Sequence, residues 1–339
     1  MAMADDTTAP RVLDRIGLGL WTMRSMALHP RNRVADYRAL GEDAVLAEQL
    51  GFHSIWSAEH RVWYDGWCPA PLHAQALVAG VTSRLRMGTA VLLATQHDPF
   101  TLARTAAVLD RCSGGRVDLG IGLGHRDVEF DTLGLRRDQR GRRMDEALEV
   151  LPAVWAGEHG DPPVDPGPAI WMGGMAPRAL ERAATKGCNV ILPQTLRPHE
   201  VRRCIDTLHS HGDWNGTVGV LRDVWIENDP QRARSIHSRF VNNFREEAGW
   251  WILKGKPAYE APDALERQMA RVADASLMGT PDEVAEGLRA LLEAGAHFLC
   301  LRINFDLASR SELREQMHRV ASELPPRLAD VISPLGVGG

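Results

Sequence analysis

Lysine is almost absent from this chain of 339 residues, which contains only Lys186, Lys254 and Lys256. Lyases and aldolases of the Schiff-base type need a lysine amine that attacks a carbonyl group. The three lysines fall in a predicted helix and in a long connecting segment, and none follows a predicted strand. The sequence therefore offers almost no candidate for Schiff-base chemistry.

Cysteine is also scarce. The five cysteines are odd in number, and no pair has the C-x-x-C spacing. This pattern argues against a disulfide framework and against a zinc site, so we predict no metal centre. Free thiols fit a reducing compartment, and we expect a cytoplasmic protein.

Long apolar runs and excess positive charge are lacking as well. No uncharged run of eighteen residues occurs, and the first ten residues carry acidic side chains without an apolar segment. We therefore predict neither an export signal nor a membrane span. With 39 basic against 44 acidic residues, the net charge of −5 does not favour nucleic acid as a partner. An arginine cluster at 135–143 fits a solvated helix start or a single phosphate ligand.

Short runs rich in Val, Ile and Leu alternate with longer segments of helical period, which predicts parallel strands joined by helices. The eight predicted strands are 15–21, 52–58, 85–93, 116–123, 169–174, 189–193, 217–227 and 297–303. Helices are predicted at 36–51, 99–115 and 143–157, and another follows Thr280, which forms a capping box with Glu283. Asp98 is the predicted N-cap of the helix that starts at Pro99.

Eight such units could form an open doubly wound sheet or a closed barrel. The last unit, 280–322, repeats the same pattern to the end of the chain, which favours an α/β fold of the (β/α)8 TIM-barrel type. We predict one barrel domain at 13–325, between a flexible N-terminus at 1–12 and a tail at 326–339. The segment 238–278 is too long for an ordinary connection and is predicted to lie over the C-terminal face of the barrel.

Ionisable groups follow two of the predicted strands directly. Glu59, His60 and Arg61 come after the second strand, and His97 comes after the third. Because reactive groups of such barrels sit at the carboxyl ends of the strands, these residues are candidates for a ligand site. His60 also fits a surface loop in which it pairs with Glu59, and His97 also fits a structural role in its turn.

Glycines recur at two other strand ends. Gly120, Gly122 and Gly124 are spaced by two, but a dinucleotide fingerprint would need glycine at His125 and a helix there, and we expect neither. Alternating glycines instead let a flat ring or a backbone approach closely. Gly173 and Gly174 precede a helix whose N-terminus suits a phosphate, although a tight turn alone would also need glycine.

Several segments together resemble the luciferase-like monooxygenase family of flavin-dependent barrels. They are LGFHSIWSAEHR, LRMGTAVLLATQHDPFTLARTAAVLDRCSGGRVDLGIGLGHRDVEFDTLGL, RMDEALEVLPAVWAG, IWMGGMAPRALERAATKG and MGTPDEVAEGLRALLEAGAHFLCLR. The resemblance implies a flavin site in which Glu59 and His60 match the active-site Glu-His pair, with His97 as a further catalytic residue. It also implies a non-prolyl cis peptide at Thr89–Ala90.

The cofactor contacts that this resemblance implies are Thr89, Ala90, Gly122, Gly124, Arg142 or Arg143, Gly173, Gly174, Met175 and Ala176. The luciferases of the family carry Cys-Arg where this chain has Gly122-Leu123, so one phosphate-binding arginine is lost and light emission is not expected. Trp21, Trp63 and Trp67 are expected to provide an apolar pocket that excludes water.

The family also implies a function. We expect a monooxygenase that uses O2 and reduced FMN to oxidise a small organic substrate, with a separate flavin reductase because no nicotinamide fingerprint is present. His60 would transfer a proton, while Glu59 fixes its tautomer or orients a neighbour. A dehydrogenase or reductase that uses the deazaflavin coenzyme F420, and a non-catalytic flavin-binding relative, remain alternatives. A homodimer is expected from the family.

Overall fold

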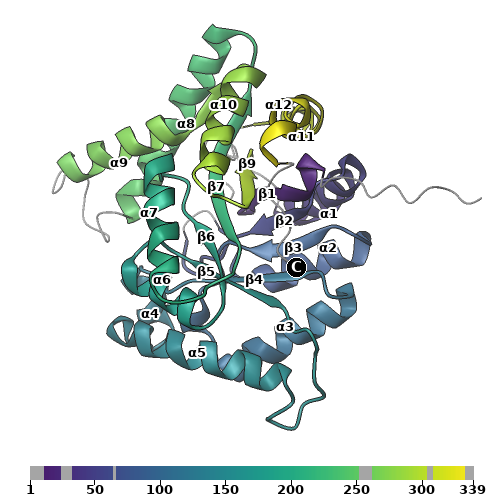
Figure 1. Cartoon of the computed structure of the whole chain (residues 1–339), viewed down its shortest axis with the longest axis vertical. Coiled ribbons are helices and arrows are strands. Elements are labelled where there is room, and N and C mark those ends of the chain that lie inside the picture. The colour runs from purple at the N-terminus through teal and green to yellow at the C-terminus, as the bar shows by residue number, and fades with distance from the viewer. Residues whose placement is uncertain (1–10, 24–32, 64–65, 252–261, 304–307, 333–339) are drawn as a thin grey trace, which may run out of the picture.

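The computed structural model describes residues 11–23, 33–63, 66–251, 262–303 and 308–332. Within them, eight parallel strands close into a barrel in the order β6-β5-β4-β3-β2-β1-β9-β7, and β7 pairs back to β6 (Figure 1). These strands are β1 Ile16–Trp21, β2 Ser54–Ser57, β3 Arg86–Thr89, β4 Val117–Ile121, β5 Ala169–Gly173, β6 Asn189–Leu192, β7 Val218–Ile226 and β9 Phe298–Arg302. The predicted (β/α)8 TIM barrel is confirmed.

Helices surround the barrel, as Figure 1 shows. They are α1 Arg33–Leu50, α2 Pro71–Val81, α3 Pro99–Ser113, α4 Asp127–Thr132, α5 Arg140–Trp155, α6 Pro177–Thr185, α7 Pro198–His209, α8 Pro230–Trp251, α9 Pro262–Ala275, α10 Pro281–Glu293, α11 Arg310–Glu323 and α12 Pro325–Ile332, with 3-10 turns η1 Val12–Arg15, η2 Ala94–Gln96 and η3 Arg137–Gln139. None of the helices in the described part of the chain is long and apolar enough to cross a membrane.

The predicted helix caps are present. Asp98 accepts a hydrogen bond of 2.8 Å from the Thr101 backbone amide at the start of α3. At the start of α10, Thr280 and Glu283 cap each other's backbone amides in the predicted capping box. These caps satisfy amides that a helix start otherwise leaves without partners, so the sequence places both helix starts correctly.

Aromatic side chains fill the interior of the barrel. The Trp56 indole is fully buried, and its ring centroid lies 5.5 Å from that of Trp171 and 5.8 Å from that of Phe298. Gly88 leaves room for this packing, because a Cβ atom there would lie 2.3 Å from the Trp56 ring. A packed interior leaves the carboxyl-terminal mouth of the barrel as the place for a ligand.

The predicted excursion at 238–278 is an insertion with its own small core. It begins earlier than predicted, because α8 already starts at Pro230, and it ends in the short strand β8 Leu277–Gly279, which pairs with β7. Residues 252–261 lie outside the described residues. The core of this insertion consists of Trp225, Phe240, Phe244, Leu265, Met269 and Val272. In Figure 1, α8 and α9 lie at one end of the molecule.

Three expectations need correction. The tail predicted at 326–339 is helical up to Ile332, and Leu328 and Ile332 are fully buried, so this part packs onto the barrel domain. Residues 333–339 lie outside the described residues, as do residues 1–10 of the predicted flexible N-terminus, while Val12 is buried in η1. A helix does open near His125, since α4 starts at Asp127. The closed barrel nevertheless excludes the dinucleotide-binding fold.

Candidate active site

A cavity of about 230 Å3 lies at the carboxyl-terminal mouth of the barrel. Residues in or directly after the barrel strands line it, including Leu20 of β1, Leu221 of β7 and Arg302 of β9. Of the predicted site residues, it brings together Glu59, His60, Trp67, Ala90, Gly122, Gly124, Gly173 and Gly174. These predicted residues are up to 115 positions apart, from Glu59 to Gly174.

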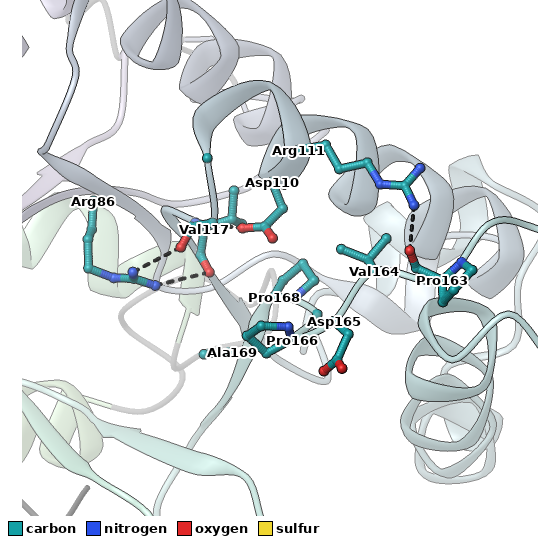
Figure 2. Close-up of a pocket in the computed structure, with 13 residues that line it drawn as sticks. Arg86, Asp110, Arg111, Val117, Pro163, Val164, Asp165, Pro166, Pro168 and Ala169 are labelled. Atoms are coloured by element: carbon teal, nitrogen blue, oxygen red, sulfur yellow. Dashed lines mark hydrogen bonds between the residues drawn. The ribbon is translucent and has the colours of Figure 1, made fainter.

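A larger cavity of about 600 Å3 lies at the opposite end of the strands (Figure 2). Its lining includes Arg86, Val117 and Ala169, which are the first residues of β3, β4 and β5, respectively. Figure 2 shows that Arg86 donates to the Val117 carbonyl and that Arg111 donates to the Pro163 carbonyl, contacts of 3.4 and 2.6 Å. Arg86 Nε also donates to Oδ2 of Asp118 at 2.8 Å. These contacts hold loops together at the face that supports stability in such barrels, so we place the chemistry at the smaller cavity.

Glu59 organises one group of side chains beneath the mouth. Its side chain is fully buried, and Oε1 accepts from Arg61 Nε at 3.0 Å and lies 3.0 Å from His97 Nε2. Its Oε2 accepts from the Leu93 backbone amide at 2.7 Å. Of the two roles predicted for Glu59, this geometry matches the orientation of neighbours, here Arg61 and His97. The sequence did not indicate a role for Arg61, and the structure shows that it contacts both Glu59 and His97.

His60 belongs to a different group. Its Nδ1 lies 2.8 Å from Oε1 of Glu129 on α4, and the same oxygen accepts from the Arg61 backbone amide at 3.2 Å. Burial would raise the pKa of Glu129, but the hydrogen bond from His60 and the nearby charges of His60 and Arg126 outweigh it, so the pKa is lowered. An ionised carboxylate only accepts, so this contact with Glu129 requires a proton on His60 Nδ1.

Sequence reasoning missed Glu129, because no helix was expected after the fourth strand. The available signal was the acidic pair Asp127 and Glu129 directly after a glycine-rich strand end, where first-turn carboxylates commonly open a helix. Its function as a partner of His60 depends on a contact between residues 69 positions apart. The helix propensity of a segment does not reveal such a long-range contact.

Aromatic rings surround His60. The ring centroids of Trp63 and Trp67 lie 4.5 and 4.8 Å from that of His60, and the Arg126 guanidinium carbon lies 4.4 Å from the Trp63 centroid. Trp67 lines the cavity, whereas Trp63 packs on His60. Trp21 does not line the cavity, because its buried indole points to Asp43 at 3.4 Å.

His125, which the sequence did not single out as a site residue, also lines the cavity. Its ring centroid lies 5.9 Å from that of His60. Burial, helped by the charge of His60, lowers the pKa of His125 to about 4. At neutral pH this ring is therefore uncharged and presents one donor and one acceptor.

Glycines allow β3, β4 and β5 to pack closely beside the cavity. The Thr89 hydroxyl donates to the Gly120 carbonyl at 2.7 Å, and a Cβ atom at Gly120 would collide with the Thr89 carbonyl oxygen. A Cβ atom at Gly122 or Gly173 would lie 2.4 Å from a Val91 methyl group. These glycines therefore let the segment at Thr89–Val91 pack closely against β4 and β5. Of the two interpretations of the glycine spacing, a flat ring or a close approach of the chain, the structure shows the second.

The non-prolyl cis peptide of this region joins Ala90 to Val91, one residue beyond the position expected at Thr89–Ala90. A second non-prolyl cis peptide joins Gly19 to Leu20 at the end of β1. Leu20, Ala90 and Val91 all line the cavity. The expectation of a cis bond is therefore correct for the segment and wrong by one residue for the bond.

The predicted phosphate contacts are more scattered. Gly174 adopts a positive φ of 136°, and Ala176 is the N-cap of α6, while the Met175 side chain is half exposed. Arg143 donates to the carbonyls of Thr95 at 2.5 Å and His97 at 2.9 Å, and Arg142 contacts Gln139 at 3.1 Å. Within the described residues, neither arginine lines the cavity.

The chain belongs to the luciferase-like monooxygenase family, whose model matches residues 17–297. Among curated proteins, it is 30% identical over 234 residues to the oxygenase component of flavin-dependent trigonelline monooxygenase from Acinetobacter baylyi, a match that covers 61% of this chain and 65% of the relative. It is 26% identical to 4-hydroxyprotoasukamycin monooxygenase from Streptomyces nodosus subsp. asukaensis, with 93% of each chain covered. The predicted enzyme class, a luciferase-like oxidoreductase, is confirmed.

A further relative is F420-dependent glucose-6-phosphate dehydrogenase from Nakamurella multipartita, which is 27% identical over 77% of this chain and 85% of its own. Among solved structures, monooxygenase RslO1 from Streptomyces bottropensis has a TM-score of 0.75 at 23% identity, with 92% of this chain and 99% of that chain covered. The oxygenating constituent of 3,6-diketocamphane monooxygenase from Pseudomonas putida, in complex with FMN, has a TM-score of 0.71 at 18% identity, with 87% and 94% covered. At these identities the structures establish the shared fold.

Proposed function

We propose that this protein is a flavin-dependent monooxygenase that uses O2 and reduced FMN from a separate flavin reductase to oxidise a small organic substrate. The observation that carries the proposal is His60, which lines the cavity among aromatic rings and is oriented by a buried carboxylate. The printed name of one relative, an oxygenase component, supports a two-component system.

The cavity suits a flavin in two respects. Its wall between β3 and β5 is mostly apolar, and Gly173 and Gly174 lead to the N-terminus of α6, whose free amides and dipole suit a phosphate. Next to Gly124, the Gln96 side chain is 5% exposed, and neither of its amide atoms has a partner among the described residues. Such a buried amide fits the mixed donors and acceptors of a flavin ring.

The proposed roles follow from this arrangement. Gly122, Gly124, Gly173, Gly174 and Ala90 would border the flavin, Met175 and Ala176 would offer backbone amides to its phosphate, and Thr89 would hold β3 against β4. The predicted role of Arg142 or Arg143 in phosphate binding would require new side-chain positions, because Arg143 now donates to two carbonyls.

Bound reduced flavin supplies the electrons that activate oxygen. His60, with its Nδ1 proton held by Glu129, would accept or donate a proton at Nε2. The rings of Trp63 and Trp67 would exclude water from this atom. Glu59 and His97 would act indirectly, because with Arg61 they fix the chain on either side of His60.

A titration of the purified protein with reduced FMN and with reduced F420, followed by tryptophan fluorescence, tests the cofactor. Trp67 lines the cavity, so a ligand there should quench its emission. We expect tighter binding of FMN. Tighter binding of F420 would instead favour the alternative of a deazaflavin-dependent dehydrogenase or reductase, which the relative from Nakamurella multipartita motivates.

The variant His60→Ala tests the reaction. We expect it to bind FMN like the wild type and to lose about a hundredfold or more in turnover, because a positioned acid–base group typically contributes that much. Substrates are sought by a screen of small organic compounds with a flavin reductase. Unchanged turnover would refute the role of His60, and wild-type protein that oxidises no compound would revive the alternative of a non-catalytic flavin-binding relative.

We further propose that the protein forms a homodimer through the outer face of α2 and α3 and that it works in the cytoplasm. Leu77 and Val81 on α2 and Val108 on α3 are exposed, and a groove of about 360 Å3 runs between the two helices. All five cysteines are free thiols, which suits a reducing compartment. Sedimentation of the wild type and of Val108→Glu would test the dimer, since a buried charge should dissociate it.

A further inference from the structure

A buried arginine lies on the side of the cavity formed by β9. Arg302 is the last residue of β9 and lines the cavity, although it is only 8% exposed. Its Nε donates to Oδ1 of Asp223, which is its register partner on β7. For its two terminal nitrogens, no hydrogen bond to another described residue is present. Asp223 therefore orients the guanidinium through Nε, and the two terminal nitrogens are available to a ligand in the cavity.

The insertion helix α8 also fixes this guanidinium. The rings of Phe240 and Phe244 each lie 5.8 Å from its carbon atom, at the edge of cation–π range. Both rings belong to the core of the insertion, so the side chain is oriented by two independent parts of the fold. Pre-organisation of this kind lowers the entropy that a charged side chain loses when it binds a ligand.

The charge around Arg302 is not fully balanced. Arg222, adjacent to Asp223, is also buried, and its terminal nitrogens donate to the carbonyls of Leu196 at 2.6 Å and Ala275 at 2.8 Å. Burial lowers the pKa of Arg222 to about 10, so it remains protonated at neutral pH. Asp274 also acts on Arg222, but it is paired with Arg197 at 2.7 Å, so three arginines share the carboxylates of Asp223 and Asp274, which leaves an excess positive charge beside the cavity.

The other ionisable groups of the cavity do not cancel this excess. The Glu59 carboxylate is engaged by Arg61 and His97, and His125 is neutral. Among the described residues that line the cavity, Arg302 is the one arginine or lysine. An uncharged substrate would displace water from the terminal nitrogens of Arg302 without supplying a charged acceptor, which is unfavourable.

We propose that Arg302 binds a carboxylate of the substrate, so that the enzyme oxidises small organic acids. This inference rests on the proposed function, because it assigns the substrate class of the same site. A planar carboxylate matches the guanidinium fork with two parallel hydrogen bonds. The phosphate of the flavin is the competing anion, but the expected phosphate site lies at Gly174 and α6, which follow β5 rather than β9.

Calorimetric titrations of the FMN-loaded protein test this assignment. Butyrate, benzoate and phenylacetate are each compared with the corresponding primary amide, which has the same shape but no charge. We expect at least one acid to bind about thirtyfold more tightly than its amide, as expected for a buried charge pair worth about 2 kcal/mol or more. Arg302→Gln should abolish this preference while amide binding and FMN binding stay unchanged, and Arg302→Lys should retain part of it.

Each other outcome has a defined meaning. If no acid binds better than its amide to the wild type, or if the preference survives in Arg302→Gln, the proposal is wrong. If Arg302→Gln loses affinity for FMN, Arg302 belongs to the cofactor site instead. The wild-type comparison does not depend on whether the variants fold. The same titrations without flavin separate the two proposals, because a failure of FMN binding refutes the proposed function and leaves the preference for acids measurable.

Discussion

The contact between His60 and Glu129 makes a prediction that separates this carboxylate from its neighbour Glu59. In Glu129→Gln the amide keeps the shape of the side chain but loses the charge that holds a proton on His60 Nδ1. An amide can also donate to Nδ1 and thereby stabilise the opposite tautomer. We expect the Nε2–H tautomer to become populated in the variant, whereas Glu59→Gln should leave the tautomer of His60 unchanged.

The magnitude follows from the contacts of the buried carboxylate. Its Oε1 accepts from His60 and the Arg61 amide, and it lies 3.4 Å from Arg126 Nη1. Each hydrogen bond to a charged group contributes about 1.5–3 kcal/mol, but an amide retains part of it. We therefore expect a loss of about 1–3 kcal/mol in the free energy of unfolding and of about a hundredfold in turnover, with unchanged affinity for FMN.

The assay is nitrogen NMR of protein labelled at histidine, because the two ring nitrogens have different shifts in the two tautomers. The His60 signals are assigned with the His60→Ala variant. Turnover and urea unfolding are measured on the same samples. If the tautomer of His60 is the same in the wild type and in Glu129→Gln, and turnover changes less than twofold, Glu129 does not position His60 and the reasoning fails.

Two further predictions concern stability. Glu48 accepts from the backbone amides of Ser83, Arg84 and Leu85, and although burial opposes it, these bonds lower its pKa to about 2. The ionised Glu48 carboxylate stabilises the fold fully above its unfolded pKa of about 4.5, and this contribution disappears as the pH falls toward 2. Glu48→Gln should therefore cost about 1–2 kcal/mol in the free energy of unfolding in urea at pH 7 and almost nothing near pH 2. Gly173→Ala should cost about 1–3 kcal/mol through its contact with Val91, whereas Gly80→Ala, which meets no atom within 4 Å, should be neutral or stabilising; equal thermal shifts in the two variants would contradict the packing argument.

The sequence predicts the barrel well because period and composition act locally. All eight predicted barrel strands are present, and the caps at Asp98 and Thr280 mark helix starts through side chains only three residues from the amides that they satisfy. The insertion is harder to predict. Its small core pairs Phe240 and Phe244 with Leu265 and Met269 across a segment that has no strong pattern of its own.

The site is predictable in position but not in pairing. The rule that reactive groups follow barrel strands places Glu59 and His60 at the mouth, and their adjacency suggests a pair. Consecutive residues of an extended chain, however, point to opposite sides. Glu59 accordingly turns to Leu93 and Arg61, and His60 turns to α4.

The same rule accounts for the partners that the sequence did not reveal. Glu129 lies on α4, which follows β4, and Arg302 ends β9, the last strand of the barrel. Each therefore meets its neighbours at the mouth only after the barrel closes. Closure places His60, which follows β2, and Arg302, the last residue of β9, at the ends of two strands that flank β1. A substrate held by Arg302 would therefore reach His60 across the end of one strand. Because β1 lies between β2 and β9, the strand ends that carry the two groups are two strand spacings apart, about 10 Å, and the substrate together with the two side chains must span this distance.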